Sequence, residues 1–97
     1  ENFIETIKNN NLVLVDVFAK WCGPCRTISP IIDELSNEFE NNVIISKVDA
    51  DESRNTVTEL GVRSIPAIFL YKNGEIVDRS TGMTSKENLK QMIEKHL

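Results

Sequence analysis

Apolar residues follow two different patterns in the first half of the chain, and each pattern predicts a different element. Residues 12–18 (LVLVDVF) are a nearly unbroken apolar run rich in Val, typical of a strand covered on both faces. Residues 43–49 (VIISKVD) are rich in β-branched residues and predict a second strand. From Pro24 to Phe39, apolar side chains recur every three or four positions, which is typical of an amphipathic helix. A strand, a helix and a second strand in this order predict a parallel pair with a helical crossover.

The second half of the chain predicts a hairpin and a closing helix. Residues 67–71 form an apolar strand, and Asn73-Gly74 is a strong signal for a tight hairpin turn. Residues 75–80 are therefore expected to pair antiparallel with the first strand of the hairpin. Thr84 with Glu87 resembles a capping box and predicts a helix start. The apolar face of that helix is expected to contain Leu89, Met92, Ile93 and Leu97.

Two shorter helices complete the expected order of elements. Asn2 with Glu5 resembles a capping box at the N-terminus, followed by a face of Phe3, Ile4 and Ile7. Residues 53–60 form the second short helix, and the glycine that follows them suits a left-handed helix end. The fold class is therefore α/β, with a central mixed β-sheet flanked by helices on both faces. At 97 residues, the chain is expected to form a single domain, 1–97.

Composition and charge exclude several classes of protein. The net charge of −4 and the absence of a basic run argue against a nucleic-acid partner and against binding to an anionic membrane. No apolar run approaches the roughly 20 residues of a membrane span, and the first residues lack the layout of a signal peptide. Two cysteines are too few for a disulfide-rich secreted domain. A globular protein with chemistry concentrated in a short motif is the remaining class.

The distinctive motif is Trp21-Cys22-Gly23-Pro24-Cys25, between the first strand and the long helix. A structural disulfide across two intervening residues would remove little entropy from the unfolded chain, about 2 kcal/mol. A zinc site needs four ligands, and the chain offers two Cys and one His, so no metal is expected. Two buried thiols without a task would fit Cys25 on the apolar helix face. Such a role fits Cys22 less well, because exposure is expected at the corner between strand and helix.

Thiol–disulfide exchange explains the motif better than these alternatives. It requires a thiolate that attacks and a second thiol that resolves the mixed disulfide. Cys22 is expected at the helix N-terminus, where free N–H groups and the helix dipole stabilise a thiolate. Pro24 suits the first helical turn, and Gly23 allows the backbone of a substrate to approach. Cys25 would then lie about one turn further along, within reach of Cys22.

The motif and its surroundings closely resemble the thioredoxin family over nearly the whole chain. The matching features are WCGPC, the LVLVDVF strand before it, and Ser64-Ile65-Pro66-Ala67 and Lys72-Asn73-Gly74-Glu75 after it. The resemblance implies the thioredoxin fold. It also implies that the usual first strand of the family is missing, because the chain begins at what resembles the first helix of the family.

The resemblance implies a role for each matching residue. Cys22 is implied as the nucleophile and Cys25 as the resolving thiol, so that the pair forms the redox disulfide. Asp16 matches a buried carboxylate that accepts a proton, and Lys47 matches the residue on the adjacent strand that modulates it. The residues alone also favour a buried Asp16, because Val15 and Val17 flank it, whereas Lys47 on its own could equally be solvated.

Further matching residues are implied to shape the site and its groove. Pro66 matches the cis-proline of the family, although a proline that opens a strand is otherwise expected to be trans. Pro30 matches a proline inside the active-site helix, while His96 is expected to be solvated. The residues implied to shape the active site are Gly23, Pro24, Trp21 and Pro66. The residues implied to line the substrate groove are Trp21, Ile65, Pro66 and Gly82.

The expected activity is that of a general protein-disulfide reductase acting through Cys22 and Cys25. The resemblance implies no bound cofactor, and reduction by NADPH through thioredoxin reductase. It implies client proteins with accessible disulfides, such as ribonucleotide reductase, peroxiredoxins and methionine sulfoxide reductases. It further implies a monomer in a reducing, cytoplasmic location. Two alternatives remain: a disulfide oxidase or isomerase of the same fold, and a non-catalytic binding module using the groove around Trp21, Ile65 and Gly82.

Overall fold

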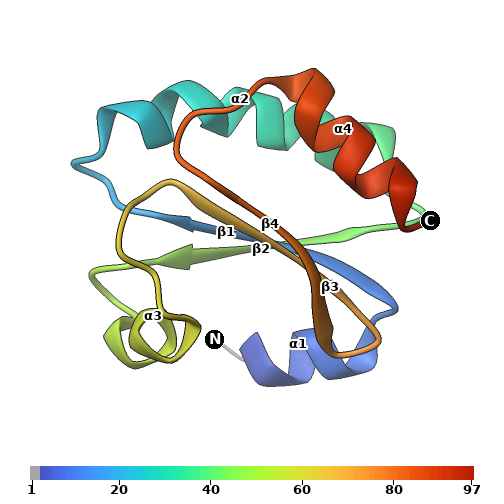
Figure 1. Ribbon diagram of the computed structural model, residues 1–97, viewed down its shortest axis with the longest axis horizontal. Helices are drawn as coiled ribbons and strands as arrows, with labels where there is room; N and C mark the ends of the chain where they lie inside the picture. Colours follow the sequence, from blue (N-terminus) through green and yellow to red (C-terminus); the bar gives the residue numbers. More distant parts are fainter. Residues whose placement is uncertain (1–2) are drawn as a thin grey trace.

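Four strands form one mixed sheet that separates two pairs of helices (Figure 1). The computed structural model describes residues 3–97. Across the sheet the strand order is β2-β1-β3-β4, with β1 parallel to β2 and the other neighbours antiparallel. The elements are α1 (Phe3–Asn9), β1 (Leu12–Phe18), α2 (Gly23–Glu38), β2 (Ile44–Asp49), α3 (Arg54–Leu60), β3 (Ala67–Lys72), β4 (Glu75–Thr81) and α4 (Lys86–Lys95). This is the mixed sheet with helices on both faces that the sequence predicts.

Alternation along β1 creates a separate core on each face of the sheet. Leu12 and Leu14 belong to the cluster beneath α2 and α4, to which α2 contributes Ile28 and Ile32 and α4 contributes Ile93. All of these side chains are almost completely buried. Burial of this apolar layer holds α2 against the sheet and so fixes the position of its N-terminus.

The three valines of β1 face the opposite layer, and Asp16 is the one charged residue of the strand. Val13, Val15 and Val17 point toward α1 and α3 and pack in a second cluster. Asp16 follows the alternation of Leu12 and Leu14, so its carboxylate lies on the α2 side of the sheet. A charged group is thereby placed in an otherwise apolar layer, directly behind the start of α2.

The ends of the elements agree with the sequence prediction to within about two residues, but two details of the last helix differ. Ser85, and not Thr84, caps α4: its hydroxyl oxygen accepts a hydrogen bond from the Asn88 N–H at 3.1 Å. The predicted capping box at Thr84 is therefore wrong, because the chain enters the helix one residue later. Leu97 lies beyond the end of α4 and is exposed, so it does not belong to the apolar face that was expected.

The predicted turns are confirmed, whereas the first helix differs in one detail. Asn73 and Gly74 both have positive φ, 54° and 87°, as a tight hairpin turn between β3 and β4 requires. Gly61 ends α3 in the left-handed conformation with φ 71°. In α1, Phe3 and Ile7 pack against the core but Ile4 is exposed, because it lies about 100° around the helix from Phe3. The predicted cap at residue 2 lies outside the described residues.

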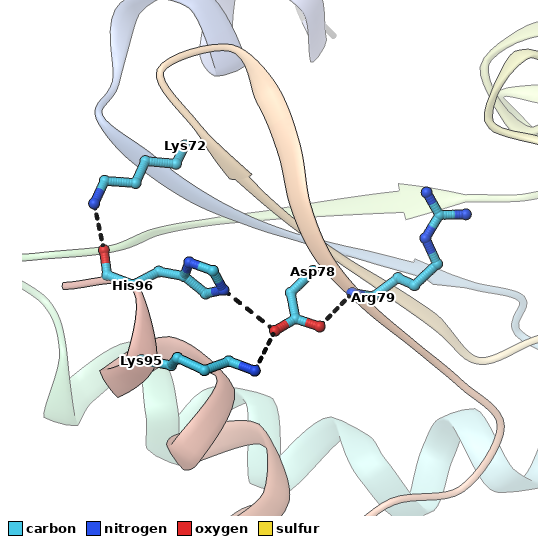
Figure 2. A network of polar contacts seen from close by, with 5 residues as sticks. All are labelled: Lys72, Asp78, Arg79, Lys95 and His96. Atoms are coloured by element: carbon cyan, nitrogen blue, oxygen red, sulfur yellow. Dashed lines mark hydrogen bonds and ion pairs between the residues drawn. The ribbon is translucent and has the colours of Figure 1, made fainter.

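A polar network holds the end of α4 against the hairpin of β3 and β4 (Figure 2). The carboxylate of Asp78 on β4 lies 3.2 Å from His96 Nε2 and 3.6 Å from Lys95 Nζ, and it accepts a hydrogen bond from the Arg79 N–H. Lys72 Nζ on β3 donates to the carbonyl oxygen of His96 at 2.9 Å. The expectation of a solvated His96 is therefore wrong: its side chain is only 21% exposed, because β4 supplies a carboxylate beside the helix end.

Candidate functional site: a disulfide at a helix N-terminus

Cys22 and Cys25 form a disulfide at the N-terminus of α2, with their Cα atoms 5.2 Å apart. Cys22 is the N-cap residue of the helix: its backbone is extended, and its sulfur accepts a hydrogen bond from the Cys25 N–H at 3.2 Å. The expected position of Cys22 at the helix terminus is confirmed. At this position, unpaired N–H groups and the positive end of the helix dipole stabilise a sulfur anion.

The local sequence explains why the helix begins at this point. After β1 ends at Phe18, the Cys22 N–H donates to the Ala19 carbonyl at 3.1 Å, which turns the chain into α2. Gly23 and Pro24 are the first two helical residues, where the missing N–H of proline leaves no hydrogen bond unmade. A Cβ atom on Gly23 would meet no atom within 4 Å, so space is open outside this residue.

Both cysteines are buried in the oxidised protein, at 5% and 4% exposure for Cys22 and Cys25. The expectation that Cys22 is exposed at the strand–helix corner is therefore wrong. It is covered because Ala19 and Ile65 pack against the disulfide. Access to the Cys22 sulfur thus depends on neighbouring segments and not only on the position of the residue in the chain.

A distant segment, at residues 65 and 66, lies against the disulfide. The Ile65–Pro66 peptide bond is cis, as the family resemblance implied. The Ile65 carbonyl oxygen lies 3.9 Å from Cys22 Sγ, and the Ile65 side chain packs on the cysteine cluster. Gly82, with φ 83°, donates its N–H to the Pro66 carbonyl at 2.8 Å. The three predicted groove residues Ile65, Pro66 and Gly82 therefore lie together.

Trp21 is held at the site through its ring nitrogen, while most of its side chain remains in solvent. The residue is 67% exposed, and its Nε1–H donates to Asp51 Oδ2 at 2.9 Å. Asp51 was not predicted from the sequence as a residue of the site. A signal was available, because Asp51 follows β2 at the same edge of the parallel pair at which the Cys22 loop follows β1.

Asp16 lies behind the disulfide, as predicted, and is only 3% exposed. It lines a cavity of about 340 Å³ whose other lining residues are Phe18, Ala19, Lys20, Cys25, Arg26, Ser29 and Lys47. Its Oδ1 atom has no hydrogen-bond partner among residues 3–97. Burial raises the pKa of Asp16 from 3.8 to about 6, with the positive charge of Lys47 acting against this rise and the negative charge of Asp33 adding to it.

Lys47 lies directly opposite Asp16 in the register of β1 and β2. Its ammonium group, however, forms its ion pair with Asp33 of α2, at 3.2 Å. Among the described residues, no ion pair includes Asp16. The family resemblance correctly placed Lys47 opposite Asp16, whereas Asp33, which binds the ammonium group, was not predicted from the sequence.

The site thus contains the parts that thiol–disulfide exchange requires. A sulfur sits at a helix N-terminus, a second sulfur lies next to it, and a carboxylate of raised pKa shares a cavity with the second sulfur. Over residues 3–97, no group of three or more His, Cys, Asp or Glu side chains is placed to hold a metal ion. Within the same residues, no helix is long and apolar enough to cross a membrane.

Comparison with known proteins agrees with this geometry. The family model described as Thioredoxin matches residues 1–95. A thioredoxin of Rickettsia conorii is 45% identical over 96% of this chain and 89% of its own length, and one of Staphylococcus saprophyticus is 43% identical over 99% and 91%. A solved structure of Plasmodium falciparum thioredoxin has a TM-score of 0.90 and 40% identity, covering 98% of this chain and 91% of its own. On the family model, these relatives and the shared fold, the chain belongs to the thioredoxin family.

Proposed function

We propose that this member of the thioredoxin family is a general protein-disulfide reductase that transfers two electrons from Cys22 and Cys25 to a client disulfide. The observation that carries the proposal is the position of Cys22 Sγ as the N-cap of α2, where it accepts the Cys25 N–H. A sulfur in this position is stabilised as a thiolate, which is the attacking species in disulfide exchange.

In the first step the Cys22 thiolate attacks one sulfur of the client disulfide. The client S–S bond breaks, a bond forms between Cys22 and the client, and one client thiolate leaves. Open space outside Gly23 and the position of Ile65 beside the two cysteines support an approach of the client along this side. In this proposal the exposed ring of Trp21 and the segment at Gly82 border the groove.

In the second step Cys25 resolves the mixed disulfide. Its thiol loses a proton, its sulfur attacks Cys22 Sγ, and the second client thiolate leaves as the Cys22–Cys25 disulfide forms. Asp16 is the proposed proton acceptor, because it shares a cavity with Cys25 and its pKa of about 6 keeps it ionised near neutral pH while making it a stronger base than an ordinary carboxylate. The cavity is large enough for water to carry the proton between them.

The electrons that regenerate the dithiol are proposed to come from NADPH through a thioredoxin reductase. Clients are proposed to be proteins with accessible disulfides, with ribonucleotide reductase, peroxiredoxins and methionine sulfoxide reductases as examples taken from the family. A reducing compartment such as the cytoplasm is the proposed location, because the dithiol form must be maintained for the first step. Proposed contacts to clients run through backbone groups at Ile65, so a shared sequence motif among clients is not expected.

A trapping experiment tests the proposed roles of the two cysteines. Cys25→Ser removes the sulfur that resolves the mixed disulfide, so it should accumulate covalent complexes with client proteins that dithiothreitol releases. Cys22→Ser should accumulate almost none, because Cys25 lacks the N-cap position. Non-reducing gels of both variants after incubation in a lysate measure the difference.

Reduction of insulin by the wild-type protein with NADPH and a thioredoxin reductase provides the matching activity assay. If Cys25→Ser trapped nothing while a variant lacking both sulfurs still bound the same partners, the exchange mechanism would be wrong. The groove would then serve as a binding surface without redox chemistry.

A further inference from the structure

The ion pair between Lys47 and Asp33 lies beside the buried carboxylate of Asp16 and has no place in the mechanism above. Lys47 is directly opposite Asp16 in the β1–β2 register, yet its ammonium group is bound by Asp33 at 3.2 Å. Asp16 is left with one oxygen that has no hydrogen-bond partner in the described part of the chain. The position of this ammonium group therefore depends on a residue of α2.

We propose that Asp33 is a positioning residue for the resolving step: it holds the Lys47 ammonium group away from Asp16 and so leaves Asp16 without a close cationic partner. This inference rests on the proposed role of Asp16 as proton acceptor. Asp33 does not line the cavity that Asp16 shares with Cys25, and in this proposal it acts only through Lys47 and through its own charge.

Three cationic residues lie around the cavity of Asp16. Lys20, which follows β1, Arg26 of α2 and Lys47 of β2 line the same cavity. On the side of β3, the residue opposite Asp16 is the apolar Ile68. The Arg26 guanidinium is bound by the backbone, since it donates to the Lys20 carbonyl at 2.8 Å. Lys47 is therefore the cation whose position Asp33 controls.

Both effects of Asp33 on Asp16 act in the same direction. Its negative charge opposes ionisation of the buried carboxyl, and its ion pair with Lys47 weakens the opposing influence of that cation. Removing Asp33 frees the Lys47 ammonium group to turn toward the unpaired oxygen of Asp16. Asp16 should then be ionised at lower pH and become a weaker base for the Cys25 proton.

Breaking the ion pair from its two ends separates this role from a merely structural one. Asp33→Asn should lower the pKa of Asp16 by about 0.2–0.7 unit, the range expected from one exposed ion pair. Lys47→Gln should raise the pKa of Asp16, because a cation near the carboxylate is lost. A general loosening of the fold would shift both variants in the same direction, so opposite signs are diagnostic.

The chain offers a matched control and a rescue variant. Glu34→Gln removes the same charge from the next residue of α2 and also breaks an ion pair, the one with Lys86 at 3.0 Å, but it leaves Lys47 untouched. Asp33→Glu keeps the charge and should retain the wild-type pKa of Asp16. Direct titration of the Asp16 carboxyl carbon by NMR in the oxidised protein measures all four variants without any thiol that titrates.

The inference is supported if Asp33→Asn lowers the pKa of Asp16 while Glu34→Gln and Asp33→Glu leave it unchanged. It is overturned if Asp33→Asn leaves this pKa unchanged, raises it, or shifts it no more than Glu34→Gln does. The rate at which mixed disulfide is released tests the proposed function separately. In Asp33→Asn the pH at which the release rate is half-maximal should fall by the same amount as the pKa of Asp16, about 0.2–0.7 unit. A shifted pKa with an unshifted rate profile would leave the positioning role intact and refute the role of Asp16 as proton acceptor.

Discussion

Replacing Asp16 by asparagine should stabilise the protein at neutral pH, although it removes a residue of the site. Asp16 is 3% exposed, and burial raises its pKa from 3.8 to about 6. The Asp16 carboxyl of the folded protein therefore stays protonated up to a higher pH than in the unfolded chain. The free energy of unfolding falls as the pH rises from 3.8 to about 6, and this fall levels off at higher pH.

The size of the effect follows from the difference between the two pKa values. One pKa unit corresponds to about 1.36 kcal/mol, so a rise from 3.8 to about 6 amounts to about 3 kcal/mol. Asp16→Asn carries no charge at any pH and should recover this free energy at pH 7. Below about pH 3.8, where Asp16 is protonated in both states, the variant should gain nothing from this source.

Urea unfolding followed by far-UV circular dichroism, at several pH values from about 3.5 to 8, measures the difference between variant and wild type. The oxidised protein is used so that neither cysteine titrates. Any fixed effect of the amide group cancels, because only the change with pH is attributed to ionisation. Glu40→Gln, an exposed position, controls for the loss of one negative charge. A difference that stays constant across this pH range, or that decreases as pH rises, would refute the reasoning.

Three other substitutions or modifications should have measurable effects on reactivity or stability. In the reduced protein at pH 7, iodoacetamide should alkylate Cys22 at least about ten times faster than Cys25, measured by mass spectrometry of the peptides, and equal rates would contradict the N-cap argument. Asp78→Ala should lower the free energy of unfolding by about 1 kcal/mol at pH 7. Burial alone would raise the pKa of Asp78, but its contacts with Arg79 and with the end of α4 lower this pKa. The loss of stability should therefore shrink as the pH falls below about 4. An equal loss at about pH 3 in urea unfolding would argue against this reasoning. Gly82→Ala should cost about 1–2 kcal/mol in thermal unfolding because φ is 83°, while a Cβ atom there meets no neighbour, and an unchanged melting temperature would show that the backbone relaxes.

Local patterns in the sequence were sufficient for the elements and for the first part of the site. A continuous apolar run, a period-3.6 pattern and the Asn73-Gly74 turn signal all depend on neighbouring residues, and they placed β1, α2 and the hairpin correctly. The same patterns put Cys22 at a helix N-terminus and Asp16 inside a buried strand. Both properties depend on the element in which a residue lies, and the element is visible in the sequence.

Contacts between distant segments were decided only by the tertiary structure. Ile65 covers Cys22 although 43 positions separate them, which is why Cys22 is buried where exposure was expected. Lys47 lies opposite Asp16 as the register requires, but its flexible side chain carries the ammonium group to Asp33 on another element. Register places a Cα atom, whereas the partner of a long charged side chain depends on every charge within its reach, and the fold alone brings those charges together.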